Sequence, residues 1–200
     1  MGTQNDYQKS GQNSKAMAFH ADERLCIIID GANLYTTLKT LDFDINYSKL
    51  LELFKAKSRL QRAYYYTAII EDEDFSPIKP LIDWLDYNGY HVVSKPAKQY
   101  KDRDGRVKTK GNMDIEMAVD MMELAPHIDH FLLFTGDGDF RRAVEAVQKL
   151  GSRVTVVSSM LKRPAMLADE LRRQADDFIE LADLDKLIGR PKSGDVWDET

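Results

Sequence analysis

Short apolar segments recur along the chain, and many of them are rich in β-branched or aromatic residues. Their lengths are those of buried strands in a sheet. Five segments of this kind predict strands: Leu25–Ile29, Arg62–Ile70, Tyr90–Val93, His130–Thr135 and Arg153–Val157. A sixth segment, Phe178–Leu181, predicts a last short strand or a turn.

Segments in which apolar residues recur at helical spacing lie between these strands. After Asn46, for example, Leu50, Leu51 and Phe54 fall on one helical face. We expect helices over residues 46–57, 76–88, 111–125, 140–150 and 165–174. Strands that alternate with helices in this way predict an α/β fold, in which helices cover both faces of a central parallel sheet of about five strands.

The composition indicates one domain with flexible ends. A chain of 200 residues, of which 43% are hydrophobic, can bury a core of ordinary size. We expect a flexible segment over residues 1–22, where Gln, Asn, Ser and Gly dominate, a domain over 23–188 and a flexible tail over 189–200. There is neither an apolar stretch of the roughly 18 residues that cross a bilayer nor a hydrophobic signal core, so we expect a cytoplasmic protein with no membrane partner.

Aspartates follow two of the predicted strands. Asp30 follows the first strand, and Asp137 and Asp139 follow the fourth. Parallel strands joined by right-handed crossovers all end at one edge of the sheet, which is where open α/β folds bind ligands. The helix that comes after the third strand must also begin at this edge, and Asp114 lies in its first turn. We therefore expect four carboxylates from distant parts of the chain to meet there.

Helical geometry places Asp114 among apolar neighbours. At 100° per residue, Met117, Ala118 and Met121 fall within about 60° of it, so we expect Asp114 on the sheet-facing side of its helix. Any one of the four acids could be an ordinary cap or turn residue. Carboxylates gathered at one edge repel each other, however, and a divalent cation relieves that repulsion. The acids therefore predict a metal site.

The acids belong to short motifs that are more specific in combination than singly. These are Asp30-Gly31-x-Asn33, Lys110-Gly111-x-x-Asp114, Thr135-Gly136-Asp137-x-Asp139-Phe140 and a closing Ser158-Ser159 with Ala175-Asp176-Asp177-Phe178-Ile179. From about Leu25 to Leu181, the chain resembles NYN domains of the LabA-like group, within the PIN-like nuclease superfamily. The resemblance implies a single domain of the PIN-like, Rossmann-like type.

The resemblance also implies a function, namely a metal-dependent endoribonuclease that hydrolyses single-stranded or structured RNA with Mg²⁺ or Mn²⁺. Asp30, Asp114 and Asp137 would be metal ligands, directly or through water. Asp139 would orient or deprotonate the attacking water, or bind a second ion. Asn33 would hold Asp30 or an oxygen of the scissile phosphate. The resemblance further favours a homodimer.

A basic segment adjoins the acids. Lys95–Lys110 has no apolar period and is expected to be a loop. It contains seven lysines or arginines and two aspartates, a local charge of +5, although the whole chain has a formal charge of −5. A basic loop beside an acidic metal site suits a phosphate backbone. We expect its residues Lys98, Lys101, Arg103 and Arg106 to bind RNA, the alternative being a solvated surface loop.

Two other functions are compatible with these residues. A regulatory module would keep the acidic site and contact RNA or a protein without turnover. A phosphatase of the Asp-x-Asp type would use Asp137 and Asp139, although that motif follows the fourth predicted strand and not the first. RNA cleavage with Mn²⁺ would separate the nuclease from both, and activity on a small phosphomonoester alone would favour the phosphatase.

Overall fold

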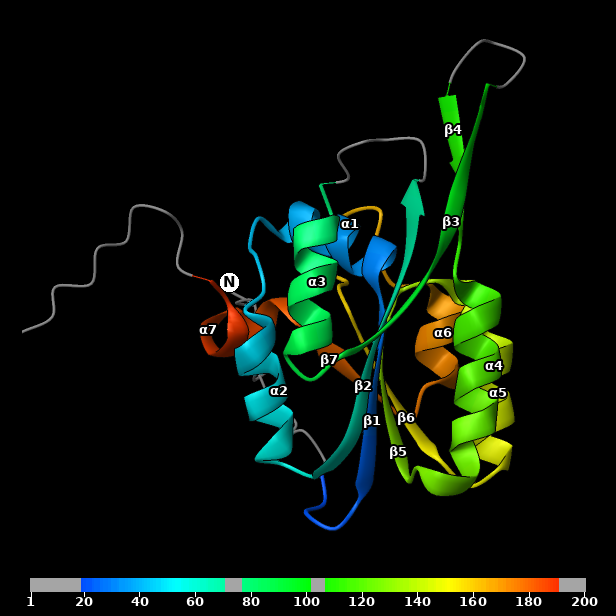
Figure 1. The fold of residues 1–200 in the computed structure, drawn as a ribbon. Helices are drawn as coiled ribbons and strands as arrows, with labels where there is room; N and C mark the ends of the chain where they lie inside the picture. Colours follow the sequence, from blue (N-terminus) through cyan, green and yellow to red (C-terminus); the bar gives the residue numbers. More distant parts are fainter. Residues whose placement is uncertain (1–18, 71–76, 102–106, 191–200) are drawn as a thin grey trace, which may run out of the picture.

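The computed structural model of the chain describes residues 19–70, 77–101 and 107–190 (Figure 1). The flexible segments predicted at 1–22 and 189–200 therefore lie mostly outside the described residues. No helix within the described ranges is both long enough and apolar enough to cross a membrane.

A seven-stranded sheet forms the centre of the fold, in the order β4-β3-β2-β1-β5-β6-β7. Its parallel strands are β1 (Arg24–Asp30), β2 (Arg59–Ile70), β3 (His91–Lys101), β5 (His130–Phe134), β6 (Arg153–Ser158) and β7 (Asp177–Glu180). A short strand, β4 (Val107–Lys110), pairs antiparallel with β3 at one outer edge. This topology confirms the predicted single α/β domain with a central parallel sheet.

Helices cover both faces of the sheet (Figure 1). One face carries α1 (Gly31–Leu41), α2 (Tyr47–Lys55), α3 (Lys79–Tyr87) and α7 (Asp185–Ile188). The other face carries α4 (Asp114–Leu124), α5 (Arg141–Lys149) and α6 (Asp169–Gln174). Three 3₁₀ turns complete the helical elements: η1 (Ala125–His127), η2 (Gly138–Phe140) and η3 (Leu181–Leu184).

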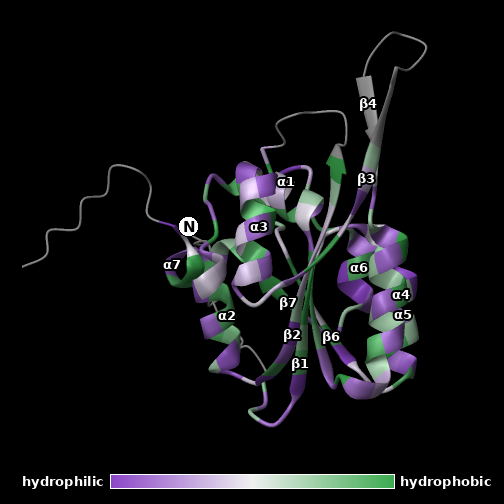
Figure 2. Ribbon diagram, viewed as in Figure 1, coloured by the Kyte–Doolittle hydropathy of each residue, from purple (hydrophilic) through white to green (hydrophobic). Residues whose placement is uncertain are grey.

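The central strand β1 is buried on both sides. Ile27 and Ile29 belong to the apolar cluster under α1 and α2, whereas Cys26 and Ile28 belong to the cluster under α4 and α5. Figure 2 shows the matching concentration of hydrophobic residues along the central strands. A strand in this position carries a continuous apolar run, because side chains on both faces are removed from water. Because β1 is buried on both faces, the position of its carboxyl end is fixed within the fold.

Helix α1 is an element that the apolar pattern does not reveal. Its sequence contains threonines, which are weak helix formers. The hydroxyls of Thr36, Thr37 and Thr40 each donate to the carbonyl four residues earlier. The helix begins at a side-chain cap, since Asp30 accepts a hydrogen bond from the backbone N of Asn33. Capping and packing against the sheet thus outweigh the weak helical preference of the segment.

The expectation that residues 95–110 form a loop is wrong. β3 continues to Lys101, and β4 returns beside it with Lys98 opposite Lys110 and Lys101 opposite Val107. The resulting hairpin projects beyond the helices at the carboxyl end of the sheet (Figure 1). A projecting hairpin has no core face to cover, so its sequence needs no apolar alternation. Arg103 and Arg106 lie outside the described residues.

A buried histidine lies at the opposite end of the sheet. His130 is fully buried, and its Nε2 lies 2.7 Å from Thr155 Oγ1. Its Nδ1 lies 3.2 Å from Arg153 Nη2 and 3.3 Å from a carboxylate oxygen of Glu23. Burial, aided by the charge of Arg153 and opposed by the charges of Glu23 and Asp176, lowers the pKa of His130 to about 4. His130 is therefore neutral in the folded protein at neutral pH.

This histidine should make the fold sensitive to acid. Since its folded pKa is below the unfolded value, its contribution to the free energy of unfolding is complete above about pH 6.5 and is lost as the pH falls towards 4, by up to about 3 kcal/mol. His130→Gln, which cannot titrate, should flatten the pH dependence of urea unfolding between pH 6.5 and 4.5. His91→Gln, at an exposed position, is the matched control. Equal slopes for wild type and His130→Gln would contradict this assignment.

Candidate functional site

The candidate site lies where the strand order reverses. From β1 the sheet continues outwards through β2 and β3, and from the neighbouring β5 it continues through β6 and β7. Asp30 is the last residue of β1, and Asp137 and Asp139 follow β5. Crossovers that leave in opposite directions open a crevice at the carboxyl ends of such a strand pair. The acids from β1 and β5 are therefore in the position where open α/β sheets bind ligands.

Both carboxylate oxygens of Asp30 accept hydrogen bonds. Asn33 N donates to Oδ1 at 3.1 Å, and Thr135 Oγ1 donates to Oδ2 at 3.1 Å. Burial raises the pKa of Asp30 and the charge of Asp137 adds to the rise, although the two hydrogen bonds oppose it. The surrounding structure thus holds Asp30 in one orientation.

Thr135 also connects Asp30 to the next acid. Its Oγ1 accepts a hydrogen bond from Asp137 N at 3.3 Å, and Asp137 Oδ1 in turn accepts one from Asp139 N at 3.0 Å. The side chain of Asp137 is therefore the cap of η2, as an aspartate at a helix start often is. The chain of hydrogen bonds sets the relative positions of three acids from two strands.

Asn33 links α1 to the end of β5. Its side-chain Oδ1 accepts a hydrogen bond from Gly136 N at 3.0 Å. Gly136 must lack a side chain, because a Cβ there would collide with the backbone carbonyl of Met166 and would lie 2.7 Å from Ser158 Oγ. Asn33 was expected to hold either Asp30 or an oxygen of the scissile phosphate. In the structure its backbone N contacts Asp30, whereas its side chain contacts Gly136.

Asp114 reaches the site from the other face of the sheet. It is the first residue of α4, and Asn112 Nδ2 donates to its Oδ2 at 2.7 Å. Burial raises the pKa of Asp114, and the negative charges of Asp137, Asp30 and Asp139 raise it further.

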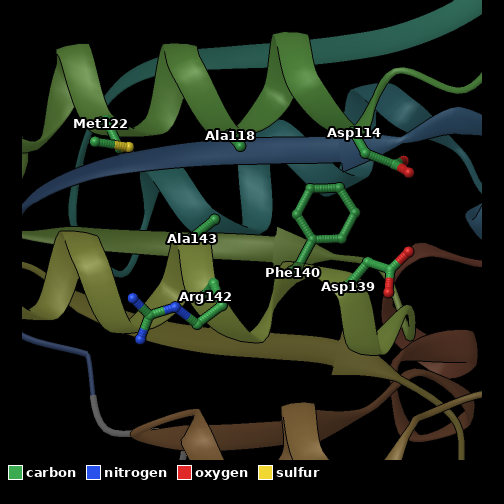
Figure 3. A pocket seen from close by; sticks show the side chains of 7 residues that line it. All are labelled: Asp114, Ala118, Met122, Asp139, Phe140, Arg142 and Ala143. Atoms are coloured by element: carbon green, nitrogen blue, oxygen red, sulfur yellow. The ribbon is translucent and has the colours of Figure 1, made fainter.

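Its orientation differs somewhat from the expected one. The sheet-facing positions of α4 are the fully buried Met117 and Met121. Asp114 instead lines, with Ala118, a pocket between α4 and α5 (Figure 3). The helical angle therefore predicted correctly that Asp114 lies on the inward side of α4. It could not show whether this side chain faces the sheet or the neighbouring helix α5.

Three of the four predicted acids come close together. Asp114, Asp137 and Asp139 each offer one carboxylate oxygen, and these oxygens all lie within 4.8 Å of one another. Asp30 lies outside this group of three, but the charge of Asp137 contributes to the raised pKa of Asp30, and the charge of Asp30 contributes to the raised pKa of Asp114. An all-oxygen donor set of this kind fits Mg²⁺ or Mn²⁺ and not a thiophilic ion. The residues present are therefore suited to a hard divalent cation.

Two further contacts, which sequence spacing did not indicate, position the elements around the site. Lys95 Nζ lies 2.7 Å from Glu116 Oε1, which joins β3 to α4. The hydroxyl of Tyr66 donates to Asp120 Oδ2 at 2.8 Å, so Asp120 joins α4 to β2. Both contacts join residues far apart in the chain, and no local motif marks them.

The pocket between α4 and α5 is the other feature that the sequence did not reveal. It has a volume of about 310 Å³. Asp114 and Asp139 lie at one end, and apolar side chains and Arg142 line the rest (Figure 3). Asp114 begins α4 and Asp139 lies in η2 just before α5, so the pocket shares two of its lining residues with the carboxylate group.

The fold and the site together define an α/β domain with a carboxylate group at its topological switch point. Residues 24–183 match the NYN domain family. The chain is 32% identical over 176 residues to the low amplitude and bright protein LabA of Synechococcus elongatus, with 86% of this chain and 90% of that protein covered. A crystal structure of a protein of unknown function from Vibrio parahaemolyticus is similar at a TM-score of 0.65 and 26% identity, covering 82% of this chain and 95% of that one. The chain therefore belongs to the NYN domain family and fits its LabA-like group, as the resemblance predicted.

The raised pKa of Asp114 leads to a prediction about stability. A carboxyl group whose folded pKa lies above its unfolded value stabilises the fold at low pH, and this contribution is lost as the pH rises through the folded pKa. At pH 7.5 without divalent ions, Asp114→Asn should therefore raise the Tm by a few degrees. Millimolar Mg²⁺ or Mn²⁺ should raise the Tm of the wild type and have a smaller effect on the variant.

Thermal unfolding with EDTA and with each ion measures both effects. Asp83→Asn, at an exposed position on α3, is the control and should respond to the ions as the wild type does. If the wild type and Asp114→Asn gained equal stability from the ions, Asp114 would not belong to a metal site.

Proposed function

We propose that this protein is a metal-dependent endoribonuclease that hydrolyses RNA phosphodiester bonds. The observation that carries the proposal is the group of carboxylate oxygens from Asp114, Asp137 and Asp139, all within 4.8 Å of one another at the switch point of the sheet. Membership of the NYN family, a PIN-like nuclease family, supports the same chemistry. The acids alone would suit several phosphoryl-transfer reactions, and the family favours RNA among the substrates.

The carboxylates would hold Mg²⁺ or Mn²⁺. Asp114 and Asp137 would be direct ligands, and Asp30, which lies outside the group of three, would act through water. When bound, such an ion neutralises the charge that develops on the phosphate oxygens and lowers the pKa of a bound water. The raised pKa values of Asp30 and Asp114 also mean that protons compete with the ion, so metal affinity should fall as the pH falls.

The remaining side chains would position the reaction. Asp139, exposed in η2 just before α5, would accept a proton from the attacking water at a carboxylate oxygen, or hold a second ion. Thr135 keeps Asp30 and Asp137 in register through its hydroxyl. Asn33 fixes the turn that follows β5 through Gly136 N. Fixed ligands reduce the reorganisation needed in the transition state, which is the main source of electrostatic catalysis.

The β3–β4 hairpin is proposed to guide the RNA backbone. It carries the basic segment 95–110 and projects from the end of the sheet at which the acids lie (Figure 1). Its base is fixed beside the site by the ion pair between Lys95 and Glu116. Gly111, where the chain returns, packs so closely that a Cβ would lie 2.8 Å from Ala68 Cβ and 2.9 Å from Ala97 Cβ. A rigid base would hold the basic arm in a constant direction relative to the acids.

The catalytic assignment predicts a large loss of activity from small changes. Asp30→Asn and Asp137→Asn should each reduce cleavage of a mixed RNA pool in Mn²⁺ by on the order of 10²-fold or more, because each removes charge from an electrostatic site. Asp83→Asn should cleave like the wild type. Full activity in both site variants would exclude the assignment. RNA binding without cleavage by the wild type would favour a regulatory module, and hydrolysis of a small phosphomonoester alone would favour a phosphatase.

The hairpin assignment predicts an effect on binding and not on folding. Lys98, Lys101, Arg103 and Arg106 are replaced together by Gln in this experiment. The Tm should change little, whereas affinity for single-stranded RNA should fall, and the log–log salt slope should decrease by roughly 0.7 for each phosphate that the variant no longer binds. Cleavage at saturating RNA should persist because the acids are unchanged.

A matched control tests whether position or charge alone matters. It replaces four lysines on the α2 and α7 side of the sheet, Lys49, Lys55, Lys57 and Lys186, by Gln. Titration of RNA at several salt concentrations then compares the three proteins. If both quadruple variants had the wild-type slope, the hairpin would be a solvated surface and the RNA path would lie elsewhere.

A further inference from the structure

The pocket between α4 and α5 shares Asp114 and Asp139 with the acid group, but the rest of its lining has no assigned part in holding a metal ion. We propose that it binds one nucleoside of the RNA strand, next to the phosphate that is cleaved. The inference rests on the proposed function of the acid group and adds to it a place for the substrate. The pocket has a volume of about 310 Å³, which is at the lower end of the range of small-molecule sites. This volume suits a single nucleoside unit and not a folded partner.

The shape of the pocket follows from small residues on facing helices. Asp114, Ala118 and Met122 recur every four residues on α4, so they line one side over about 12 Å. Ala143 of α5 lies on the other side, and the ring of Phe140, 1% exposed, lies between the two helices near Asp114 and Asp139 (Figure 3). Larger residues at the two alanine positions would bring the helix surfaces into contact. The alanines therefore leave a space that leads away from the acids.

The chemistry changes along this space in the order that a nucleic-acid strand requires. Asp114 and Asp139 at one end belong to the acid group, whose cation would meet the scissile phosphate. The centre is apolar, and a sugar or the face of a base can pack against it. Arg142, 72% exposed, lines the pocket from α5 and can meet a neighbouring phosphate. The sequence of cation site, apolar centre and guanidinium matches phosphate, nucleoside and phosphate.

The surroundings of Arg142 leave positive charge for such a phosphate. Arg142 pairs with Glu145, but the same carboxylate also pairs with Lys149 at 2.7 Å and lies 3.7 Å from Arg141. Three cations therefore share one carboxylate, and this stretch of α5 keeps a net positive charge. A phosphate that approached Arg142 would meet a cationic surface beside the acidic site.

The apolar centre also predicts what kind of recognition occurs. Ala118, Met122 and Ala143 present no hydrogen-bonding group, so they cannot read the edge of a base. Contact with an aliphatic surface is available to every base, and a methionine can adapt to different shapes. We therefore infer that this subsite binds a nucleoside with little regard to its base.

Other occupants would contact different residues. Ile115 and Val119 of α4 are 72% and 47% exposed and lie outside the pocket lining. A second copy of the chain or another protein would be expected to cover such exposed apolar side chains. The lining of the pocket includes charged groups, and the pocket adjoins the acids. An apolar protein surface would not complement these charges, so RNA is the favoured occupant.

Methyl NMR of the full chain tests occupancy directly. Alanine and methionine methyls are labelled, and a short single-stranded RNA of mixed sequence is added in Ca²⁺, with a gel to follow its integrity. The methyls of Ala118, Met122 and Ala143 should shift in proportion to bound RNA. The methyl of Ala56, exposed at the end of α2 on the opposite face of the sheet, should not shift.

Substitutions test the affinity. Ala143→Leu and Ala118→Leu, which fill the space from either side, should each weaken RNA binding roughly tenfold, within the range for the loss of one stacked base. Ala143→Ser, which keeps the space open, should bind nearly as the wild type, and a Tm for each variant confirms folding. Arg142→Gln should lower the salt slope by about 0.7, whereas Arg173→Gln, a 78% exposed ion-paired arginine on α6, should leave it unchanged.

The outcomes separate this inference from the nuclease proposal. RNA cleavage in Mn²⁺ with unmoved pocket methyls and unchanged affinity in both leucine variants would overturn the subsite and leave the nuclease intact. Methyl shifts and weakened binding without any cleavage would support the pocket as a nucleic-acid site and overturn the nuclease. Shifts of the same methyls that depend on protein concentration without RNA would identify a second copy as the occupant and overturn the subsite.

Discussion

The hydrogen bonds that Thr135 makes between the ends of β1 and β5 are the interactions on which the site depends. One hydroxyl donates to Asp30 Oδ2 and accepts from Asp137 N, so it joins acids that are 107 residues apart in the chain. The side chain of Asn33 adds a second link by accepting from Gly136 N. Without these links, mutual repulsion would drive the carboxylates apart, because each is free to turn towards water.

The rigidity of the strand ends comes from the two apolar clusters. β1 lies between them with its central residues fully buried, and β5 beside it is buried along its whole length. The apolar side chains on both faces resist any shift of these strands, since closely packed interiors do not deform gradually. Burial therefore fixes the backbone, and the polar links fix the side chains. Burial also raises the pKa values of Asp30 and Asp114, and the charge repulsion that remains raises them further.

Charge is distributed unevenly around this site. The chain has a formal charge of −5, but the hairpin segment 95–110 has +5, so the other residues together carry −10. A compact acidic group beside a basic arm suits a ligand that brings both phosphates and cations, because each partner then meets the opposite charge. Arg142 and its neighbours on α5 provide a second, smaller basic surface near the acids, since Arg142 lines the same pocket as Asp114 and Asp139.

The sequence by itself determined the class of fold and the identity of the acids. Apolar runs such as Leu25–Ile29 are buried strands, and chain order with right-handed crossovers places the residues after them at one edge. The sequence did not reveal α1, whose threonines conceal a capped and packed helix, and the expectation of a loop at 95–110 was wrong because a projecting hairpin has no core face to mark it. Only the tertiary structure decided that Asp114, Asp137 and Asp139 come within 4.8 Å while Asp30 lies apart, and that facing alanines leave a pocket between α4 and α5. Those distances arise from packing between residues remote in the chain, and periodicity within a segment carries no information about them.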